Sequence, residues 1–165
     1  MGNLAYQFIE ASRCGESIRL EGHSATELAA LTADLADTPE SAELFRALSD
    51  SRSAVCLTEA VSLVNNATDP GVVAEIVRFF TAATPQDEDF IRRLHTTLLE
   101  KSGSSGLHHA TRSQSLLGAL YLSQKRPPLQ RRLQAHLLDI DLKDDEEYLR
   151  HVDLPPCRYT KHKLA

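Results

Sequence analysis

Apolar residues recur along most of the chain at intervals of three and four positions, a spacing that places them on one side of an α-helix. The resulting stripes are Leu57, Val61 and Val64; Val73, Ile76, Val77 and Phe80; Ile91, Leu94 and Leu98; Leu117, Leu120 and Tyr121; and Leu129, Leu133, Leu137 and Ile140. Each stripe has a polar opposite face, so each helix needs neighbours to cover one side. The pattern predicts an all-α fold of about seven to nine helices.

Several segments carry residues that start helices. Ser24 and Glu27 have the S-x-x-E spacing of a capping box, in which each side chain satisfies a free backbone amide. A capping residue followed by proline at the first helical position recurs at Thr38-Pro39, Asp69-Pro70 and Thr84-Pro85. The last of these is followed by acids at residues 87–89, which the positive end of the helix dipole favours in the first turn. These signals predict a helix start at each site.

The first part of the chain, residues 1–23, allows two interpretations. The stretch LAYQFIEA fits a helix, whereas the alternation at Tyr6 and Phe8, and again at Ile18 and Leu20, also fits a hairpin. We favour a helix followed by a loop.

The other end of the chain contains a short predicted helix over residues 143–152, with acids at its start. Pro155 and Pro156 prevent the helix from continuing. We therefore expect one all-α domain over residues 1–154, followed by a basic flexible tail over residues 155–165.

From about residue 50 the predicted helices follow one another in pairs, at a spacing of roughly 35 to 42 residues. The pairs are 52–66 with 70–82, 86–101 with 106–124, and 127–139 with 143–152. The stretch SDSRSAVCLTEAVSLVNNATDPGVVAEIVRFF resembles a HEAT-type repeat, and the resemblance covers roughly residues 50–152. It implies an α-solenoid that presents a surface to a macromolecular partner. An irregular multi-helix bundle is the alternative, because SGSSG lengthens the middle turn.

Composition and charge narrow the function classes. The chain has 165 residues, 42% hydrophobic and 25% charged, as expected for one globular domain. Residues 1–82 carry 5 basic and 12 acidic side chains, whereas residues 83–165 carry 13 basic and 11 acidic ones. This polarity suits docking to a charged protein partner. The net charge of −5 does not favour nucleic-acid binding.

The sequence also predicts a cytoplasmic protein. No apolar run approaches the ~20 residues that span a bilayer, and the first residues do not form a secretory signal. The three cysteines, Cys14, Cys56 and Cys157, are far apart and form no CxxC pair. We therefore expect neither a disulfide framework nor a thiolate zinc site.

Two adjacent histidines stand in KSGSSGLHHATRSQ, a stretch that fits a turn between helices. Ser104 or Ser105 is predicted to cap the following helix, so that His108 and His109 fall in its first turn. Adjacent helical residues point about 100° apart, so these two cannot readily chelate one ion. We predict no metal and no cofactor. A small helical enzyme or a metal- or ligand-binding protein that uses these rings with His95 is the alternative function.

The remaining candidate chemistry is a basic surface. The sequence contains neither a GxSxG nucleophile elbow nor a phosphate-binding loop, so we predict no catalytic activity. The candidate partner-binding residues are Lys125, Arg126, Arg131 and Arg132, with Arg92 and Arg93 as an extension. The expected function is a helical scaffold that binds another protein through this charged surface. An inhibitor- or immunity-type protein, whose acidic half covers a basic site, is a further alternative.

Overall fold

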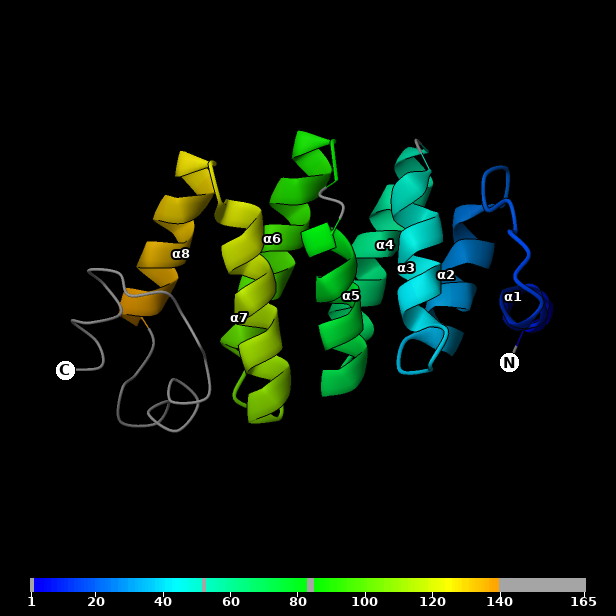
Figure 1. Ribbon diagram of the computed structural model, residues 1–165, viewed down its shortest axis with the longest axis horizontal. Coiled ribbons are helices and arrows are strands. Elements are labelled where there is room, and N and C mark those ends of the chain that lie inside the picture. The colour runs from blue at the N-terminus through cyan, green and yellow to red at the C-terminus, as the bar shows by residue number, and fades with distance from the viewer. Residues whose placement is uncertain (1, 52, 83–84, 140–165) are drawn as a thin grey trace.

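The computed structural model describes residues 2–51, 53–82 and 85–139, and these residues form eight α-helices without a strand among them (Figure 1). The helices are α1 (Asn3–Arg13), α2 (Ala25–Leu35), α3 (Ser41–Asp50), α4 (Ala54–Asn66), α5 (Pro70–Ala82), α6 (Glu88–Ser102), α7 (His109–Ser123) and α8 (Pro127–Asp139). The predicted all-α class is confirmed. Within the described ranges, no helix combines the length and the apolar character needed to cross a membrane.

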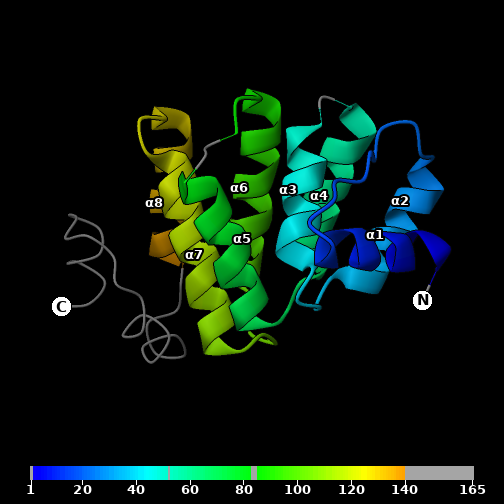
Figure 2. The same ribbon diagram turned by 45° about the vertical axis from the view of Figure 1, so that its right-hand side comes forward.

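The helices stand side by side along the long axis of the molecule and form two layers (Figure 1). In one layer α2 contacts α4, α4 contacts α6, and α6 contacts α8; in the other, α3 contacts α5 and α5 contacts α7. The layers meet mainly where α3 packs on α4 and α6 packs on α7. Helices that follow one another in sequence therefore alternate between layers. The first helix, α1, lies across the end of the array, against α2 (Figure 2).

Polar contacts within the α4–α6–α8 layer join residues a nearly constant distance apart in sequence. Arg93 of α6 contacts a residue 35 positions earlier on α4, and Arg132 of α8 contacts one 36 positions earlier on α6. Lys101, further along α6, contacts Asn65, 36 positions earlier and further along α4. Because residue numbers rise together on both partners, α4 and α6 run in the same direction. The predicted likeness to HEAT repeats stays a prediction.

The core lies between the two layers and is centred on phenylalanines. The ring of Phe45 in α3 lies 5.7 Å from that of Phe79, 6.1 Å from that of Phe80 and 6.4 Å from that of Phe90. Edge-to-face and offset arrangements at this distance are the ones aromatic rings prefer. The cluster therefore joins α3, α5 and α6 in the middle of the array.

Three of the predicted apolar stripes are buried as expected, and two are rotated. Val73, Ile76, Val77 and Phe80; Ile91, Leu94 and Leu98; and Leu129, Leu133 and Leu137 are all buried. On α4, however, Cys56, Ala60 and Leu63 are buried more deeply than Leu57 and Val61. On α7 the buried residues are Leu116, Ala119 and Leu122, whereas Tyr121 is 45% exposed. Both helices are less amphipathic than α5, α6 and α8, so packing against neighbouring helices, more than the apolar pattern, selects the side that is covered.

The α7 backbone comes unusually close to its neighbours at Gly118. A Cβ atom at this position would lie 3.0 Å from Val77 Cγ2 and 3.1 Å from both Leu98 Cδ1 and Phe80 Cζ. These side chains belong to α5 and α6, so the missing side chain of Gly118 allows α7 to pack against both helices at once.

Two of the predicted helix starts are confirmed. Ser24 and Glu27 form the complete capping box at the start of α2. Asp69 Oδ1 accepts hydrogen bonds from the amides of Gly71 (2.9 Å) and Val72 (3.1 Å) at the start of α5. The N-terminal helix followed by a loop, which we favoured over a hairpin, is confirmed as well.

Other predicted caps are wrong. Helix α3 begins at Ser41 and not at Pro39, because the Thr38 hydroxyl donates back to the carbonyl oxygen of Leu35 (2.8 Å). Asp87 caps α6 by accepting from the amide of Phe90 (2.9 Å). His108, rather than a serine, caps α7: its Nδ1 accepts from the amide of Ala110 (3.1 Å). The described residues do not include Thr84, Ile140, Cys157, the predicted helix 143–152 or the tail 155–165.

A polar network ties helix ends together at one edge of the array. Lys101 Nζ donates to the carbonyl oxygens of Asn65 (3.2 Å) and Ala67 at the end of α4. Asp37 accepts from the amides of Thr68 (2.8 Å) and Asp69 (3.0 Å). Burial lowers the pKa of Lys101, and the nearby charge of Asp37 partly opposes this effect. The network fixes the α4–α5 turn against α6.

Candidate functional site

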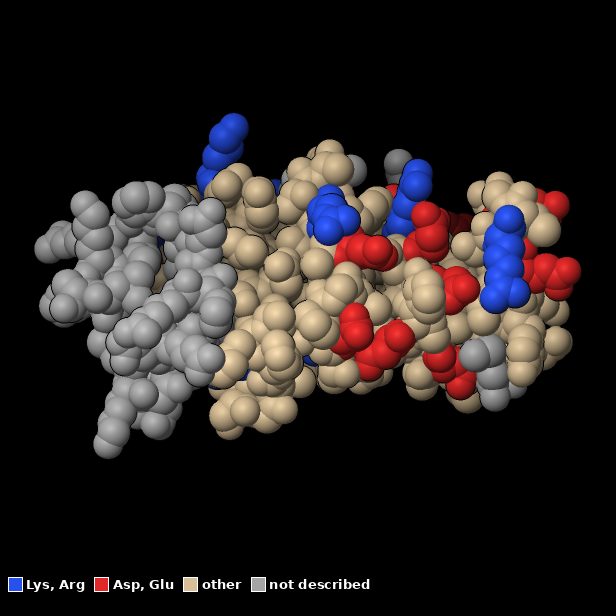
Figure 3. All heavy atoms as spheres, turned by 60° about the horizontal axis from the view of Figure 1, so that its bottom comes forward, with Lys and Arg blue, Asp and Glu red and all other residues tan. Residues whose placement is uncertain are grey.

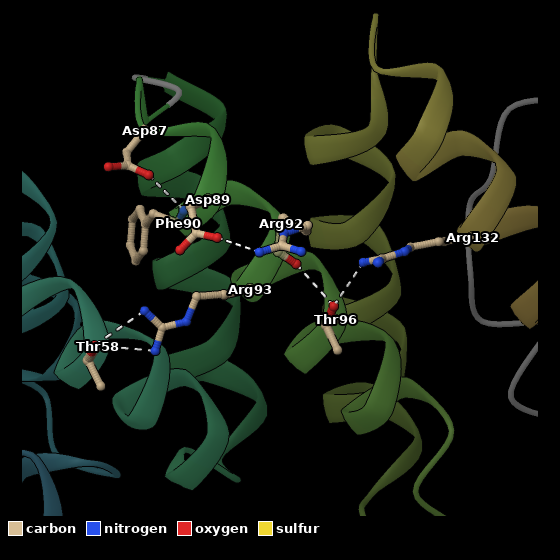
Figure 4. Close-up of polar contacts among 8 residues, drawn as sticks. All are labelled: Thr58, Asp87, Asp89, Phe90, Arg92, Arg93, Thr96 and Arg132. Atoms are coloured by element: carbon tan, nitrogen blue, oxygen red, sulfur yellow. Dashed lines mark hydrogen bonds and ion pairs between the residues drawn. The ribbon is translucent and has the colours of Figure 1, made fainter. Parts of the chain in front are cut away.

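A shallow hollow of about 350 Å³ opens on the outer side of the α4–α6–α8 layer. It is lined by Val61 of α4, by Arg92, Arg93, Thr96 and Thr97 of α6, and by Arg132 of α8. We call this hollow the arginine groove. Figure 4 shows its arginines and the threonines that they contact.

Helix α6 contributes most of the groove because of the spacing of its residues. Arg92 and Thr96 are four positions apart, as are Arg93 and Thr97, so the members of each pair are neighbours on the helix surface. The opposite side of α6 is anchored in the core by buried leucine and isoleucine side chains. The backbone that carries the arginines is therefore held by packing.

Each of two arginines reaches across a seam between helices (Figure 4). Both terminal nitrogens of Arg93 lie within hydrogen-bond distance of Thr58 Oγ1 on α4, at 3.2 and 3.3 Å. Arg132 Nη1 on α8 donates to Thr96 Oγ1 on α6 at 3.2 Å. The Thr96 hydroxyl in turn donates to the carbonyl oxygen of Arg92 (3.1 Å). The arginines thus bridge α4 to α6 and α8 to α6.

Neither of these two arginines forms an ion pair with a described carboxylate, although Asp89 lies one helical turn before Arg93. Their hydrogen-bond partners in the described chain are threonine hydroxyls, which are neutral. Arg92 differs, because it forms an ion pair with Asp89 one turn earlier on α6. The groove therefore offers two guanidinium groups without an ion-pair partner among the described residues, and we call these two groups uncompensated.

The structure separates the other predicted basic residues from the groove. Arg126 forms an ion pair with Glu88 (3.3 Å) and also contacts the carbonyl oxygen of Leu122. Lys125 is exposed in the turn before α8, with a backbone φ of 60°. Arg131 is exposed, and it points about 100° away from Arg132 because the two are adjacent on a helix. Of the six predicted contact residues, the groove contains Arg92, Arg93 and Arg132.

Sequence reasoning missed the neutral residues of the groove, namely Val61, Thr96 and Thr97, and also Thr58, which accepts hydrogen bonds from Arg93. Single threonines on a polar helix face carry no functional signal. The roles of Thr58 and Thr96 depend on an arginine about 35 residues away, and only the spacing between helices of the same layer would have pointed to it.

Acidic side chains gather elsewhere on the molecule. Figure 3 shows one face on which Asp and Glu residues lie over the half formed by the N-terminal helices, with few such residues over the rest of the visible surface. This agrees with the excess of acids in residues 1–82. The protein therefore combines an acidic N-terminal half with a separate basic groove.

The three candidate histidines do not converge on a metal site within the described residues. His95 is completely buried, and neither of its ring nitrogens has a hydrogen-bond partner in the described part of the chain. Burial lowers the pKa of His95 to about 4, and the positive charges of Arg132 and His136 add to the effect. His108 and His109 lie together at the start of α7, with ring centroids 6.4 Å apart. Nowhere in the described part of the chain do three or more His, Cys, Asp or Glu side chains converge as metal ligands.

A serine–histidine contact that the sequence did not indicate joins α6 to α8. Ser102 Oγ lies 2.7 Å from His136 Nε2 and 2.7 Å from the carbonyl oxygen of Leu99. Ser102 is fully buried, so a substrate has no access to its hydroxyl. The contact holds α8 against α6 and does not form a nucleophile of the kind that hydrolases use.

A second hollow, of about 500 Å³, lies at the other end of the array, between α1, the loop that follows it and α3. Its charged lining consists of Glu16, Glu43, Arg46 and Asp50, and Arg46 lies 3.9 Å from Asp50. The remaining lining is small or apolar. This hollow presents an acidic lining without a group that indicates a ligand.

Comparison of the chain with protein-family models, with curated proteins and with solved structures found no match.

Proposed function

We propose that the protein is a non-catalytic helical scaffold that binds another protein through the arginine groove. The observation that carries this proposal is the placement of Arg93 and Arg132 at neighbouring helix seams without a carboxylate partner in the described chain. A guanidinium group has five N–H donors, and the threonine contacts use few of them. The remaining donors can bind carboxylates of a partner in the two-pronged geometry that arginine favours.

The scaffold around the groove supports the same function. The arginines are carried on helices packed side by side, so little conformational freedom of the backbone is lost on binding. Arrays of stacked helices commonly present extended surfaces to macromolecules. The resemblance of residues 50–152 to HEAT repeats implies the same kind of role, and a cytoplasmic location is part of this proposal.

A second candidate uses the acidic half of the protein. Acidic side chains gather over the N-terminal helices on the face in Figure 3, and such a surface would suit an inhibitor- or immunity-type protein that covers a basic site. The two proposals differ in the face that contacts the partner. Charge reversal in the groove would weaken binding only in the first.

The experiment compares partner capture by two variants that carry the same change in net charge. In the groove variant, Arg93→Glu and Arg132→Glu reverse both uncompensated charges. In the matched control, Arg78→Glu and Arg131→Glu reverse two exposed arginines outside the groove. We expect proteins captured from a lysate by the wild-type chain to be retained by the control and lost by the groove variant. Equal capture by both variants would refute the proposal.

A further inference from the structure

The two uncompensated arginines lie on opposite sides of α6. Arg93 extends from α6 to Thr58 on α4, whereas Arg132 extends from α8 to Thr96 on α6 (Figure 4). One guanidinium group therefore stands at the α4–α6 seam and the other at the α6–α8 seam. Axes of packed helices are about 8–10 Å apart. The two groups are consequently separated by roughly the same distance, about 10 Å.

The surface between them is neutral. Thr97 of α6 is buried, Val61 of α4 is half-buried, and the Thr96 hydroxyl accepts from Arg132 of α8. The charge of Arg92 is already offset by Asp89. A ligand that crosses α6 therefore meets one positive group at each side and a neutral surface in the middle.

We propose that the arginine groove binds an acidic segment of a partner protein that lies across α6, with two carboxylates about 10 Å apart, one for each guanidinium group. A segment in the extended polyproline II conformation has three residues per turn and rises about 3.1 Å per residue, so acids three positions apart lie on the same side and about 9 Å apart, close to this separation. The proposal rests on the proposed scaffold function and specifies the chemistry of the partner. Recognition of acidic motifs by clustered arginines is an established mode of peptide binding.

The separation of the two charges distinguishes this ligand from other anions. A single phosphate group binds one guanidinium group closely but cannot reach a second one about 10 Å away. A nucleic acid carries many phosphates, yet it would meet a protein with a net charge of −5 and an acidic N-terminal half. An acidic protein segment can place one carboxylate at each arginine, and its negative charges need not extend beyond the groove.

The test measures binding of fluorescently labelled synthetic peptides to the full chain by fluorescence anisotropy. The first peptide has glutamates at every third position in a Gly-Ser background. A second has the same composition with the glutamates adjacent, and a third has glutamine in their place. A peptide with one phosphoserine and a single-stranded oligonucleotide represent the other anions. We expect the first peptide to bind most tightly and the glutamine peptide not to bind.

Variants then locate the binding site. Arg93→Glu or Arg132→Glu is expected to weaken binding of the first peptide by about tenfold or more, a typical loss for a charge-assisted pair. Arg131 is next to Arg132 in sequence but lies outside the groove. The substitution Arg131→Glu should therefore change the affinity for the first peptide by less than about twofold. Circular dichroism and thermal unfolding check that each variant is folded. Arg93→Lys and Arg132→Lys, which keep the charge but lose the planar fork, should weaken binding less than reversal does.

The inference is overturned if the phosphoserine peptide or the oligonucleotide binds as tightly as the first peptide, or if the peptides with the two glutamate spacings bind equally well. It is also overturned if Arg131→Glu weakens binding as much as Arg132→Glu. If captured proteins depend on the groove but the first peptide does not bind, the acidic-segment inference fails and the scaffold proposal stands. If the first peptide binds but no protein is captured through the groove, the scaffold proposal fails.

Discussion

The buried His95 side chain should make the folding stability of this protein sensitive to mildly acidic pH. The ring is fully buried on α6, and neither nitrogen has a hydrogen-bond partner among the described residues. Such a ring is neutral at pH 7, since burial and the charges of Arg132 and His136 lower its pKa to about 4. Replacement by leucine removes two unsatisfied polar atoms at a similar volume.

The size of the stability loss at low pH follows from the difference in the His95 pKa between the folded and unfolded states. As the pH falls, the unfolded chain binds a proton at His95 near pH 6.5, whereas the folded protein does so only near pH 4. The stability associated with the neutral ring is therefore fully present above pH 6.5 and is lost progressively as the pH falls to about 4. Each pKa unit corresponds to about 1.4 kcal/mol, so the loss over this interval is about 3 kcal/mol.

The assay is urea unfolding followed by circular dichroism, at several pH values between 7.5 and 4, for the wild-type chain and His95→Leu. We expect the leucine variant to be at least as stable at pH 7 and to exceed the wild type by a further ~3 kcal/mol at pH 4. The difference between the two proteins isolates His95, because both contain the same titrating carboxylates, including Asp37 and Glu27.

A matched control separates titration from packing. His95→Gln keeps polar atoms at the site but has no proton to gain in this pH range, so it should lose the same pH dependence as the leucine variant. It should also be less stable than the leucine variant, because it buries an amide. If the wild type and His95→Leu lose stability in parallel as the pH falls, the ring is hydrated or hydrogen-bonded and the reasoning is refuted.

Two further predictions concern the packing of the array. Gly118→Ala should lower the free energy of unfolding by about 1–3 kcal/mol, because the new methyl group meets Val77 and Phe80 at the α5–α7 contact. Urea titrations measure this change. A gain in stability would mean that helix propensity outweighs the crowding. Lys101→Met should lower it by about 1–3 kcal/mol, because the carbonyl oxygens of Asn65 and Ala67 lose their buried donor. Unchanged stability of the methionine variant would show that water replaces the ammonium group.

Local sequence determined the helical class and two of the helix starts, since these depend on residues within about four positions of one another. Ser24 with Glu27 and Asp69 with Pro70 could be identified as caps because the groups that satisfy the free amides are sequence neighbours. The stripe of α5 was predicted correctly for a similar reason. One side of this helix is strongly apolar, so only one side can be buried.

Tertiary structure decided the features that depend on more than one helix. The buried sides of α4 and α7 differ from the predicted stripes because these two helices are only weakly amphipathic, so contacts with neighbouring helices decide which side is covered. The Thr38-Pro39 signal did not start α3, because the Thr38 hydroxyl bonds to the end of α2 instead. Competition between two local partners for one hydroxyl cannot be resolved from the order of residues alone.

In the candidate site, too, local sequence determined some features and tertiary packing determined others. The sequence identified a group of arginines, but it did not separate Arg132, which lies in the groove, from its neighbour Arg131, which lies outside. That distinction arises from the rotation of α8 about its axis, which the packing of Leu129, Leu133 and Leu137 sets. Likewise, Arg93 meets Thr58 only because α4 and α6 lie side by side in one layer. Contacts between residues 35 positions apart require the relative placement of whole helices, and burial of the core determines that placement.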